Sequence, residues 1–202
     1  NQWFLNSGHP ILAFSYEYED STNTQWVYVE QLQNLETTPL YRLNMDIALY
    51  FEDSVITYNI DVEDGAEAVA FATESVPTNV VVDSEHMLLA EIIDEKPEEW
   101  WLDQLQAPLY MDQKLVLENL SGAALESAIN HNLKHEYWGV RELAIKAIER
   151  TDDSAQFETT LLDVAANDDR TIVRAAAIDV LATLEESGKH EELFEKATKE
   201  RS

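Results

Sequence analysis

The sequence predicts two structural units of different class: an antiparallel, immunoglobulin-like β-sandwich over residues 1–94, then an α-helical solenoid segment of HEAT or armadillo type over residues 95–202. Three observations lead to this prediction. Up to about Asp94, apolar residues alternate with polar ones with a period of two, as in strands with one buried face. Beyond that point the period becomes 3.6, which indicates amphipathic helices. The last third of the chain also repeats itself at an interval of 33 residues.

The predicted strands follow one another at short intervals. Alternation over residues 12–18 and again over 26–32, with the polar turn 21–24 between them, indicates a first hairpin rich in aromatic and β-branched residues. The same pattern over residues 43–51 and 56–62 indicates a second hairpin.

Further strands are expected downstream. Asp64-Gly65 offers a turn able to take a positive φ, before Val69 and Phe71 resume the alternation, and residues 80–82 form a short apolar strand. Six or seven short strands without an intervening helix favour an antiparallel sandwich over a βαβ sheet.

Helical features begin around residues 95–97. Pro97 suits a first helical position, and the two glutamates after it suit the positive N-terminus of a helix. Ala107-Pro108 interrupts the pattern, and residues 109–120 form a second amphipathic stretch that is expected to end at Ser121-Gly122.

The internal repeat indicates stacked helix pairs. The matching positions are Val140 with Val173, Arg141 with Arg174, Ala144 with Ala177, Ile145 with Ile178, Ile148 with Leu181, and Ala128-Ile129 with Leu161-Leu162. Such units bury their apolar stripes on one another, and stable arrays usually need three or more of them. We therefore expect the array to continue beyond Ser202.

Charge narrows the classes of partner. The chain has 40 acidic and 13 basic residues, a net charge of −27, and Arg42 is the only Lys or Arg before Lys96. Such a surface repels phosphate backbones and anionic lipids, so neither nucleic acid nor a membrane surface is expected as a partner.

The sequence leaves the compartment open. It contains no cysteine, no apolar run of spanning length and no basic leader at its start, so we expect a soluble protein, cytoplasmic or periplasmic, that begins inside a longer chain.

Histidine spacing offers the first test for a metal site. His131 and His135 have the i, i+4 spacing that places two imidazoles on one helix face, but no Glu occupies the general-base position between them. His135-Glu136 and His190-Glu191 begin like a zinc motif and lack its second histidine. No metal ligand and no bound cofactor are therefore expected in this chain, and a solvated helix face is expected at His131 and His135.

Other candidate sites favour structural roles. Asn59, Asp61 and Glu63 alternate like the first calcium ligands of an EF-hand, but Ala70 stands where the distal Glu is required, so a polar strand face is expected. No glycine-rich phosphate loop and no G-x-S-x-G motif is present. No catalytic residue is therefore assigned.

Aromatic and basic residues of the helical part are the remaining candidates. Trp100-Trp101 and Trp138 could form a ligand platform, although tryptophans at helix starts more often pack against an adjoining domain. Arg141 and Arg174, at equivalent repeat positions, are expected to pair with acidic neighbours inside the helical array.

Several segments resemble a known family. They are Gln2-Trp3-Phe4-Leu5-Asn6-Ser7-Gly8-His9-Pro10, with a W-x4-G-x-P pattern, Pro39-Leu40-Tyr41-Arg42-Leu43, Val80-Val81-Val82-Asp83 before Leu88-Leu89-Ala90-Glu91, and Ala107-Pro108-Leu109-Tyr110. Together they resemble the region where aminopeptidase N-like zinc metallopeptidases, in their larger bacterial members, pass from the catalytic domain to a β-sandwich and a helical domain.

The resemblance implies a role for the chain but no catalytic residue. The family's H-E-x-x-H motif with its distal Glu, its G-x-M-E-N segment and its catalytic Tyr have no match here. What is implied is a non-catalytic sandwich and the start of a cleft-capping helical domain. Its partners would be an upstream catalytic domain, which holds the zinc, and the peptide substrates of the parent enzyme.

Two alternatives stay open. The same architecture could be a peptide- or protein-binding scaffold from a catalytically inactive relative. An independent carbohydrate-binding sandwich would use exposed aromatics such as Tyr16, Tyr18 and Trp26, which read equally well as core residues.

Overall fold

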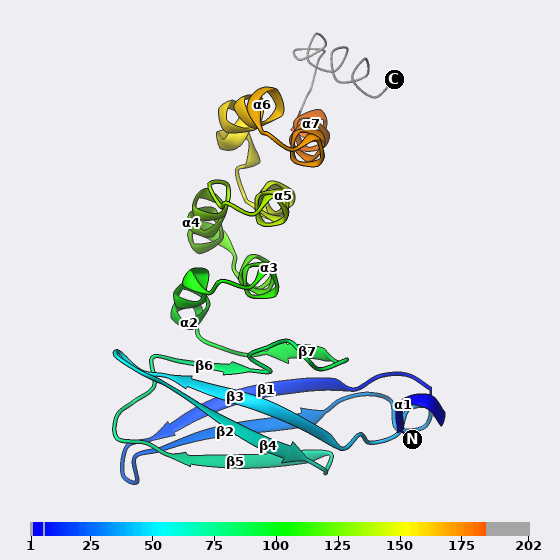
Figure 1. Ribbon diagram of the computed structural model, residues 1–202, viewed down its shortest axis with the longest axis vertical. Helices are drawn as coiled ribbons and strands as arrows, with labels where there is room; N and C mark the ends of the chain where they lie inside the picture. Colours follow the sequence, from blue (N-terminus) through cyan, green and yellow to red (C-terminus); the bar gives the residue numbers. More distant parts are fainter. Residues whose placement is uncertain (1, 6, 185–202) are drawn as a thin grey trace. The chain divides into compact units, whose positions relative to one another are not determined.

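A computed structural model describes residues 2–5 and 7–184, and its contacts divide the chain into two compact units, Asn1–Trp100 and Trp101–Ser202. Figure 1 shows strands in the first unit and helices in the second.

The first unit is built from two sheets. Its elements are α1 (Gln2–Leu5), β1 (Ile11–Glu19), β2 (Thr24–Gln31), β3 (Leu43–Tyr50), β4 (Val55–Val62), β5 (Ala66–Ala72), β6 (Asn79–Val82) and β7 (Glu91–Asp94). One sheet has the strand order β5-β2-β1-β7 and the other has the order β4-β3-β6, as the strands of Figure 1 show.

Alternating apolar side chains form the core between these sheets. Phe14 of β1 and Val27 of β2 are fully buried, as are Ile47 of β3 and Val80 of β6 from the other sheet. Neighbours such as Ser15 of β1 and Asp46 of β3 are only half-buried, because successive side chains of a strand point to opposite sides, whereas β6 is buried along its whole length. The period-two pattern therefore identified the buried face correctly.

One strand pair departs from the predicted antiparallel arrangement. β7 pairs with β1 in parallel, with Ile11 opposite Glu91, so the purely antiparallel prediction is wrong at this edge. The chain crosses from one sheet to the other after β6 through a turn at Asp83, which has a φ of 46°. The Asp83 carboxylate accepts the N–H groups of Met87 and Leu88 at 2.9 and 3.0 Å, and this fixes the crossover.

The predicted hairpin at Asp64-Gly65 is also corrected. β4 and β5 belong to different sheets, and Gly65 does not adopt a positive φ. The Glu67 carboxylate instead accepts the N–H groups of Glu63 and Asp64 at 2.5 and 2.7 Å, which stabilises a crossover between the sheets.

Helices make up the second unit, and the first of them begins within the sandwich unit. The elements are α2 (Glu98–Asp103), a 3₁₀ turn (Gln104–Gln106), α3 (Tyr110–Asn119), α4 (Gly122–Asn132), α5 (Trp138–Ala147), two 3₁₀ turns (Ile148–Arg150 and Ser154–Phe157), α6 (Glu158–Asn167) and α7 (Thr171–Leu184). Ser121-Gly122 starts a helix rather than only ending one, because Gly122 takes a φ of 53° that lets the chain turn directly into α4.

The 33-residue repeat corresponds to two helix pairs, α4 with α5 and α6 with α7. Val140 and Val173 are both buried at equivalent places in α5 and α7, as are Ala144 and Ala177. α5 contacts both α3 and α7, so these three helices stack in a row within the unit (Figure 1). None of the helices in the described residues is both long and apolar enough to cross a bilayer.

Candidate functional site

The histidine pair does not lie on one helix face. α4 ends at Asn132, so His131 occupies its last turn while His135 lies in the following turn. The Nδ1 atom of His135 accepts the N–H of Tyr137 at 3.0 Å, which ties this imidazole to the start of α5. The predicted shared helix face is therefore wrong. The reason is that α4 ends three residues before His135.

No alternative metal centre is found elsewhere in the described part of the chain. Over residues 2–5 and 7–184, no three His, Asp or Glu side chains converge as a ligand set. His190 and Glu191 lie outside the described residues.

Two of the EF-hand-like residues, Asn59 and Asp61, belong to a polar ladder across β3 and β4. The Asn59 amide nitrogen donates to Asn44 Oδ1 at 3.0 Å and to Asp46 Oδ1 at 2.8 Å. The Asn44 amide nitrogen donates to Asp61 Oδ1 at 2.8 Å. These cross-strand bonds confirm the expected polar strand face.

The three tryptophans belong to two different hydrophobic cores. Trp100 packs against the sandwich core, and its ring meets that of Tyr16 edge-on at a centroid distance of 5.3 Å. Trp101 is 3% exposed and belongs to the helical core, which Trp138 also contacts. None of these three tryptophans is among the exposed large apolar residues.

Arg141 pairs with acidic neighbours, as expected for an architectural residue. Its guanidinium binds Asp168 through two nitrogens, at 2.8 and 2.9 Å, and Asp169 at 2.5 Å. Burial acts to raise the pKa of Asp168, but the hydrogen bonds and charge of Arg141, together with hydrogen bonds from the Arg170 backbone and from Asp169, lower it on balance. Arg174 donates to the backbone carbonyl of Asp168 at 2.9 Å, so both arginines reach the same loop.

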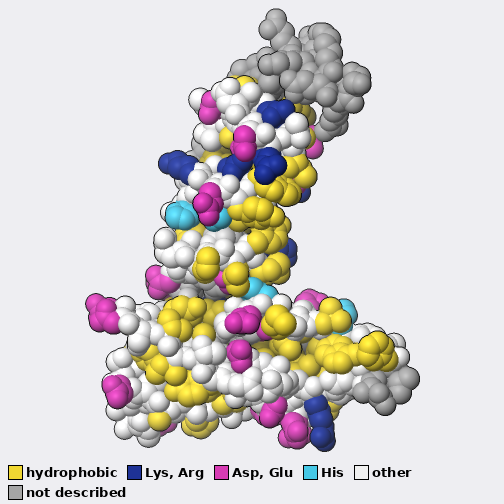
Figure 2. Space-filling model, viewed as in Figure 1, with side chains coloured by type: hydrophobic (Ala, Val, Ile, Leu, Met, Phe, Trp, Pro, Cys, Tyr) yellow, Lys and Arg dark blue, Asp and Glu magenta, His cyan; other side chains and the backbone are white. Residues whose placement is uncertain are grey.

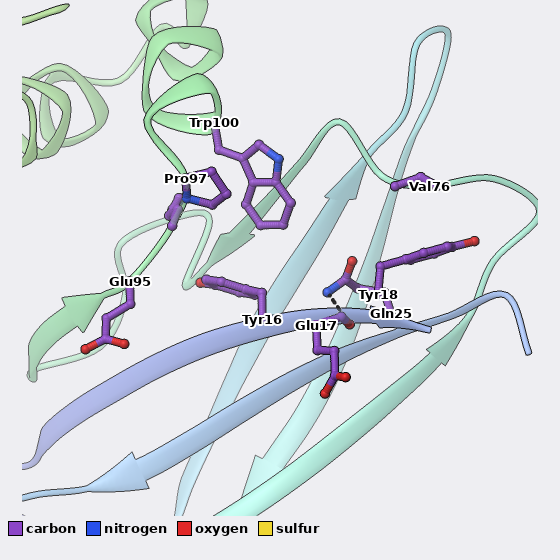
Figure 3. A pocket seen from close by; sticks show the side chains of 9 residues that line it. Tyr16, Glu17, Tyr18, Gln25, Val76, Glu95, Pro97 and Trp100 are labelled. Atoms are coloured by element: carbon purple, nitrogen blue, oxygen red, sulfur yellow. Dashed lines mark hydrogen bonds between the residues drawn. The ribbon is translucent and has the colours of Figure 1, made fainter. Parts of the chain in front are cut away.

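A hollow of about 290 Å³ opens at one end of the sandwich unit (Figure 3). It is lined by Tyr16, Glu17, Tyr18, Gln25, Val76, Glu95, Lys96, Pro97 and Trp100. Figure 3 shows the carboxylates of Glu17 and Glu95 pointing away from the aromatic rings. The hollow therefore presents mainly aromatic side chains, which suit a small apolar or planar group.

Gln25 supplies the amide of this hollow. Its amide nitrogen donates to the carbonyls of Glu17 and Trp26 at 3.1 and 2.8 Å, and its side chain is almost completely buried. These bonds fix the amide, whose oxygen lies toward the hollow in Figure 3.

A buried ion pair lies beside the hollow. Lys96 Nζ is 3.2 Å from Asp94 Oδ2, and their side chains are 1% and 8% exposed. The Tyr16 hydroxyl donates to Asp94 Oδ1 at 2.6 Å, and Lys96 Nζ donates to the Val80 carbonyl at 3.0 Å. Because Val80 belongs to β6 and Asp94 to β7, this cluster links the two sheets.

Burial controls the ionisation of the cluster. Desolvation raises the pKa of Asp94, although the charge of Lys96 and the bond from Tyr16 act in the opposite direction. Burial, with the adjacent carboxylate, raises the pKa of Tyr16 well above its ordinary value. The phenol therefore stays protonated at neutral pH and acts as a hydrogen-bond donor.

Sequence reasoning did not single out Asp94 and Lys96. The available signal was an isolated lysine, the first Lys or Arg after Arg42 in a strongly acidic stretch, three residues after the apolar pair Ile92-Ile93. A charge at the end of a strand is usually solvated, so the pattern alone does not reveal that this one is buried.

Comparison with solved structures shows what this fold is similar to. The fold is similar to part of an aminopeptidase. The crystal structure of Legionella pneumophila aminopeptidase A in complex with aspartic acid matches 96% of this chain with a TM-score of 0.65 and 14% sequence identity. This chain covers 29% of that aminopeptidase, so it spans less than a third of its length.

The likeness concerns the fold and includes residues of both units, because nearly the whole chain is matched. No family model matches the sequence, and no curated protein matches it.

Proposed function

We propose that this chain is a non-catalytic, structural portion of a zinc-dependent aminopeptidase that removes N-terminal residues from peptides. The observation that carries the proposal is the match of 96% of the chain to 29% of an aminopeptidase. In this proposal the sandwich braces the catalytic domain, and the stacked helix pairs are the start of a HEAT-like segment that caps the cleft.

The residues that the structure describes do not offer a catalytic zinc site. A catalytic site of this kind needs three protein ligands and an open position for water. His131 and His135 do not share a helix face, and no third ligand joins them in the described residues. The proposal therefore assigns the zinc to another part of the parent protein, and no catalytic step to this chain.

The test compares activities with and without an upstream catalytic segment. The 202-residue chain and a longer protein that carries an H-E-x-x-H motif are assayed with an aminoacyl-p-nitroanilide and added zinc. We expect turnover by the longer protein alone. A version of the longer protein whose motif glutamate is replaced by glutamine serves as the inactive control.

Other outcomes would change the proposal. Turnover by the 202-residue chain that a chelator abolishes would contradict it, and the region of His131 and His135 would then need to be examined first. Turnover by neither protein would favour a catalytically inactive relative.

The alternative, a peptide-binding scaffold, is favoured by one observation, the aromatic hollow at Tyr16, Tyr18 and Trp100. A small apolar side chain of a peptide fits its ring-lined surface. In that case, the Trp100 indole signal in an NMR spectrum would shift on addition of peptides with an N-terminal leucine, and a Tyr18→Ser substitution would weaken the shift.

A further inference from the structure

Two aromatic rings lie side by side on the outer face of the sheet β5-β2-β1-β7. Trp26 and Tyr28 alternate with the buried residues Gln25, Val27 and Val29 of β2, so their rings stand on the side away from the core. Their ring centroids are 6.3 Å apart and their planes differ by 16°. The two ring planes are therefore nearly parallel.

Carboxylates of β1 hold both rings at their polar edges. The Tyr28 hydroxyl donates to Glu17 Oε2 at 3.0 Å. Hydrogen bonds from Thr22, Ser21 and Trp26 lower the pKa of Glu19. We call Trp26, Tyr28, Glu17 and Glu19 the aromatic platform.

Trp26 and Tyr28 are half-buried, and the neighbouring strand β5 places only small side chains beside them. In the register of β2 with β5, Ala70 lies opposite Trp26 and Ala68 lies opposite Tyr28. Both alanines are exposed, and a single methyl group cannot reach over an indole or phenol ring. β5 is also the edge of the sheet, as Figure 1 shows, so no further strand of this sheet lies beyond it.

The platform carries negative charge that its own sheet does not balance. None of the four strands contains Lys or Arg. Arg42, the only Lys or Arg before Lys96, precedes β3 of the other sheet and lies 3.7 Å from Glu63. In Figure 2 the Lys and Arg side chains on the visible face gather mainly on the helical unit. The donors on Glu17 and Glu19 are neutral hydroxyl and indole groups.

We propose that the aromatic platform binds an extended peptide segment with arginine or lysine at alternate positions. A cation over an indole or phenol face is attracted by the ring, and a guanidinium can also stack on it. Glu17 and Glu19 lie at the ring edges, where they attract the same cations. This partner goes beyond the proposed aminopeptidase role, which assigns no partner to this face.

The spacing of the rings selects the spacing of the basic residues. In an extended peptide, side chains on the same side are two residues apart, about 6.6 Å. This distance is close to the 6.3 Å between the ring centroids, so a segment of the form Arg-x-Arg would place one cation next to each ring.

NMR of the chain with ¹⁵N-labelled tryptophan tests this proposal directly. The five indole signals report on Trp3, Trp26, Trp100, Trp101 and Trp138 separately. The probe is Ac-Arg-Ala-Arg-NH₂, beside the neutral Ac-Gln-Ala-Gln-NH₂ and the longer-spaced Ac-Arg-Ala-Ala-Arg-NH₂. We expect the Arg-Ala-Arg probe to move the Trp26 signal most, with the weakest effect from the neutral probe and a loss of affinity at high salt.

Two matched variants separate the platform from the general acidity of the chain. Glu17→Gln removes one charge at the platform and should raise the dissociation constant about three-fold. Glu52→Gln removes one charge from the exposed turn between β3 and β4 in the other sheet, and should leave the constant nearly unchanged. Trp26→Leu should abolish saturable binding, and circular dichroism checks that each variant is folded.

Three results would overturn the proposal. The Trp26 signal could stay in place at saturating probe, or Glu52→Gln could weaken binding as much as Glu17→Gln. A glucan oligosaccharide could also move the Trp26 signal when the arginine probe does not, which would show a surface for sugar rings instead.

Discussion

Lys96 and Asp94 form an ion pair that is nearly excluded from solvent. Removal of two charges from water costs several kcal/mol, and only close contacts with good geometry offset this cost. Here the bond from Tyr16 to Asp94 and the bond from Lys96 to Val80 supply such contacts. The pair is therefore sensitive to the loss of either member.

Substitution Lys96→Met should destabilise the sandwich by about 3 kcal/mol, because it leaves the Asp94 carboxylate buried without its cation. Hydrogen exchange of the amides of Val27 and Val29 measures this within the sandwich alone. Lys114→Met, which removes an exposed ion pair with Glu118 in α3, is the control and should change stability by less than about 0.5 kcal/mol. Equal effects from both substitutions would contradict the prediction.

The stability of the helical unit should depend on pH because of Asp168. Its pKa is lowered in the folded state, so the carboxylate contributes stability above its ordinary pKa of about 4, and this contribution disappears as the pH falls through the lower folded value. Asp168→Asn should cost about 1 to 2 kcal/mol at neutral pH and much less in acid.

Urea unfolding of the helical unit at neutral and acidic pH measures this difference. Asp169→Asn is the matched control, since its side chain is 75% exposed and its loss should have a smaller effect. A pH profile of Asp168→Asn that is parallel to that of the parent chain would show that this carboxylate contributes nothing to the acid sensitivity.

Among the secondary-structure elements, β1 depends on a glycine in the segment that precedes it. Gly8 has a φ of 83°, and a Cβ atom at this position would lie 2.3 Å from the Thr38 hydroxyl. Gly8→Ala should therefore cost about 2 kcal/mol or more, from backbone strain and from this overlap.

Thermal unfolding of Gly8→Ala tests this requirement. Gly65→Ala is the matched control, because Gly65 has no positive φ and its added Cβ would meet Leu40 at an ordinary 3.5 Å. The control should lie within about 1 kcal/mol of the parent chain. A melting temperature of Gly8→Ala equal to that of the control would exclude a special role for this glycine.

Alternation in the sequence was enough to place most strands but not to arrange them. The period of two tells which side chains of β1 or β4 are buried, because burial depends on local position along the strand. It carries no information on which strand lies next to which. The parallel β7 and the crossover at Gly65 depend on contacts between residues far apart in the chain, so they were not predicted.

In the candidate site, too, local sequence features were predictable, whereas contacts between strands were not. The pairing of Arg141 was foreseen, because its repeat position and the acidic loop at Asp168 are both visible in the sequence. The hollow and the aromatic platform each bring together residues of different strands or segments. Glu17 meets Tyr28 only through the register of β1 with β2. Register is set by the fold as a whole.

For the whole molecule, the net charge of −27 sets a dependence on salt. Repulsion among carboxylates weakens the compact state, and added salt screens it. We expect the melting temperature to rise between low and high concentrations of sodium chloride. An unchanged midpoint over this range would show that the negative charges are too far apart to matter.

The N-terminal segment adds an expectation about association. Phe4 is 91% exposed, and Trp3 is 41% exposed while it packs on the Tyr41 ring at a centroid distance of 4.9 Å. Exposed apolar side chains of this size are typical of interaction surfaces. Light scattering should therefore show self-association at high concentration, and Phe4→Ser should reduce it. A strict monomer would contradict this.

The parallel pairing of β7 with β1 has a consequence for the order of folding. During synthesis, β1 and β2 can pair as soon as both have emerged, but Ile11 must wait for Glu91 before this edge of its sheet is complete. Contacts between such distant parts of a chain form slowly, because the intervening segment must first be closed into a loop. A ribosome-bound chain that stops short of β7 should therefore leave this edge of β1 unpaired and open to wrong strand partners. The final closure of the sandwich would then be a late event that depends on four residues.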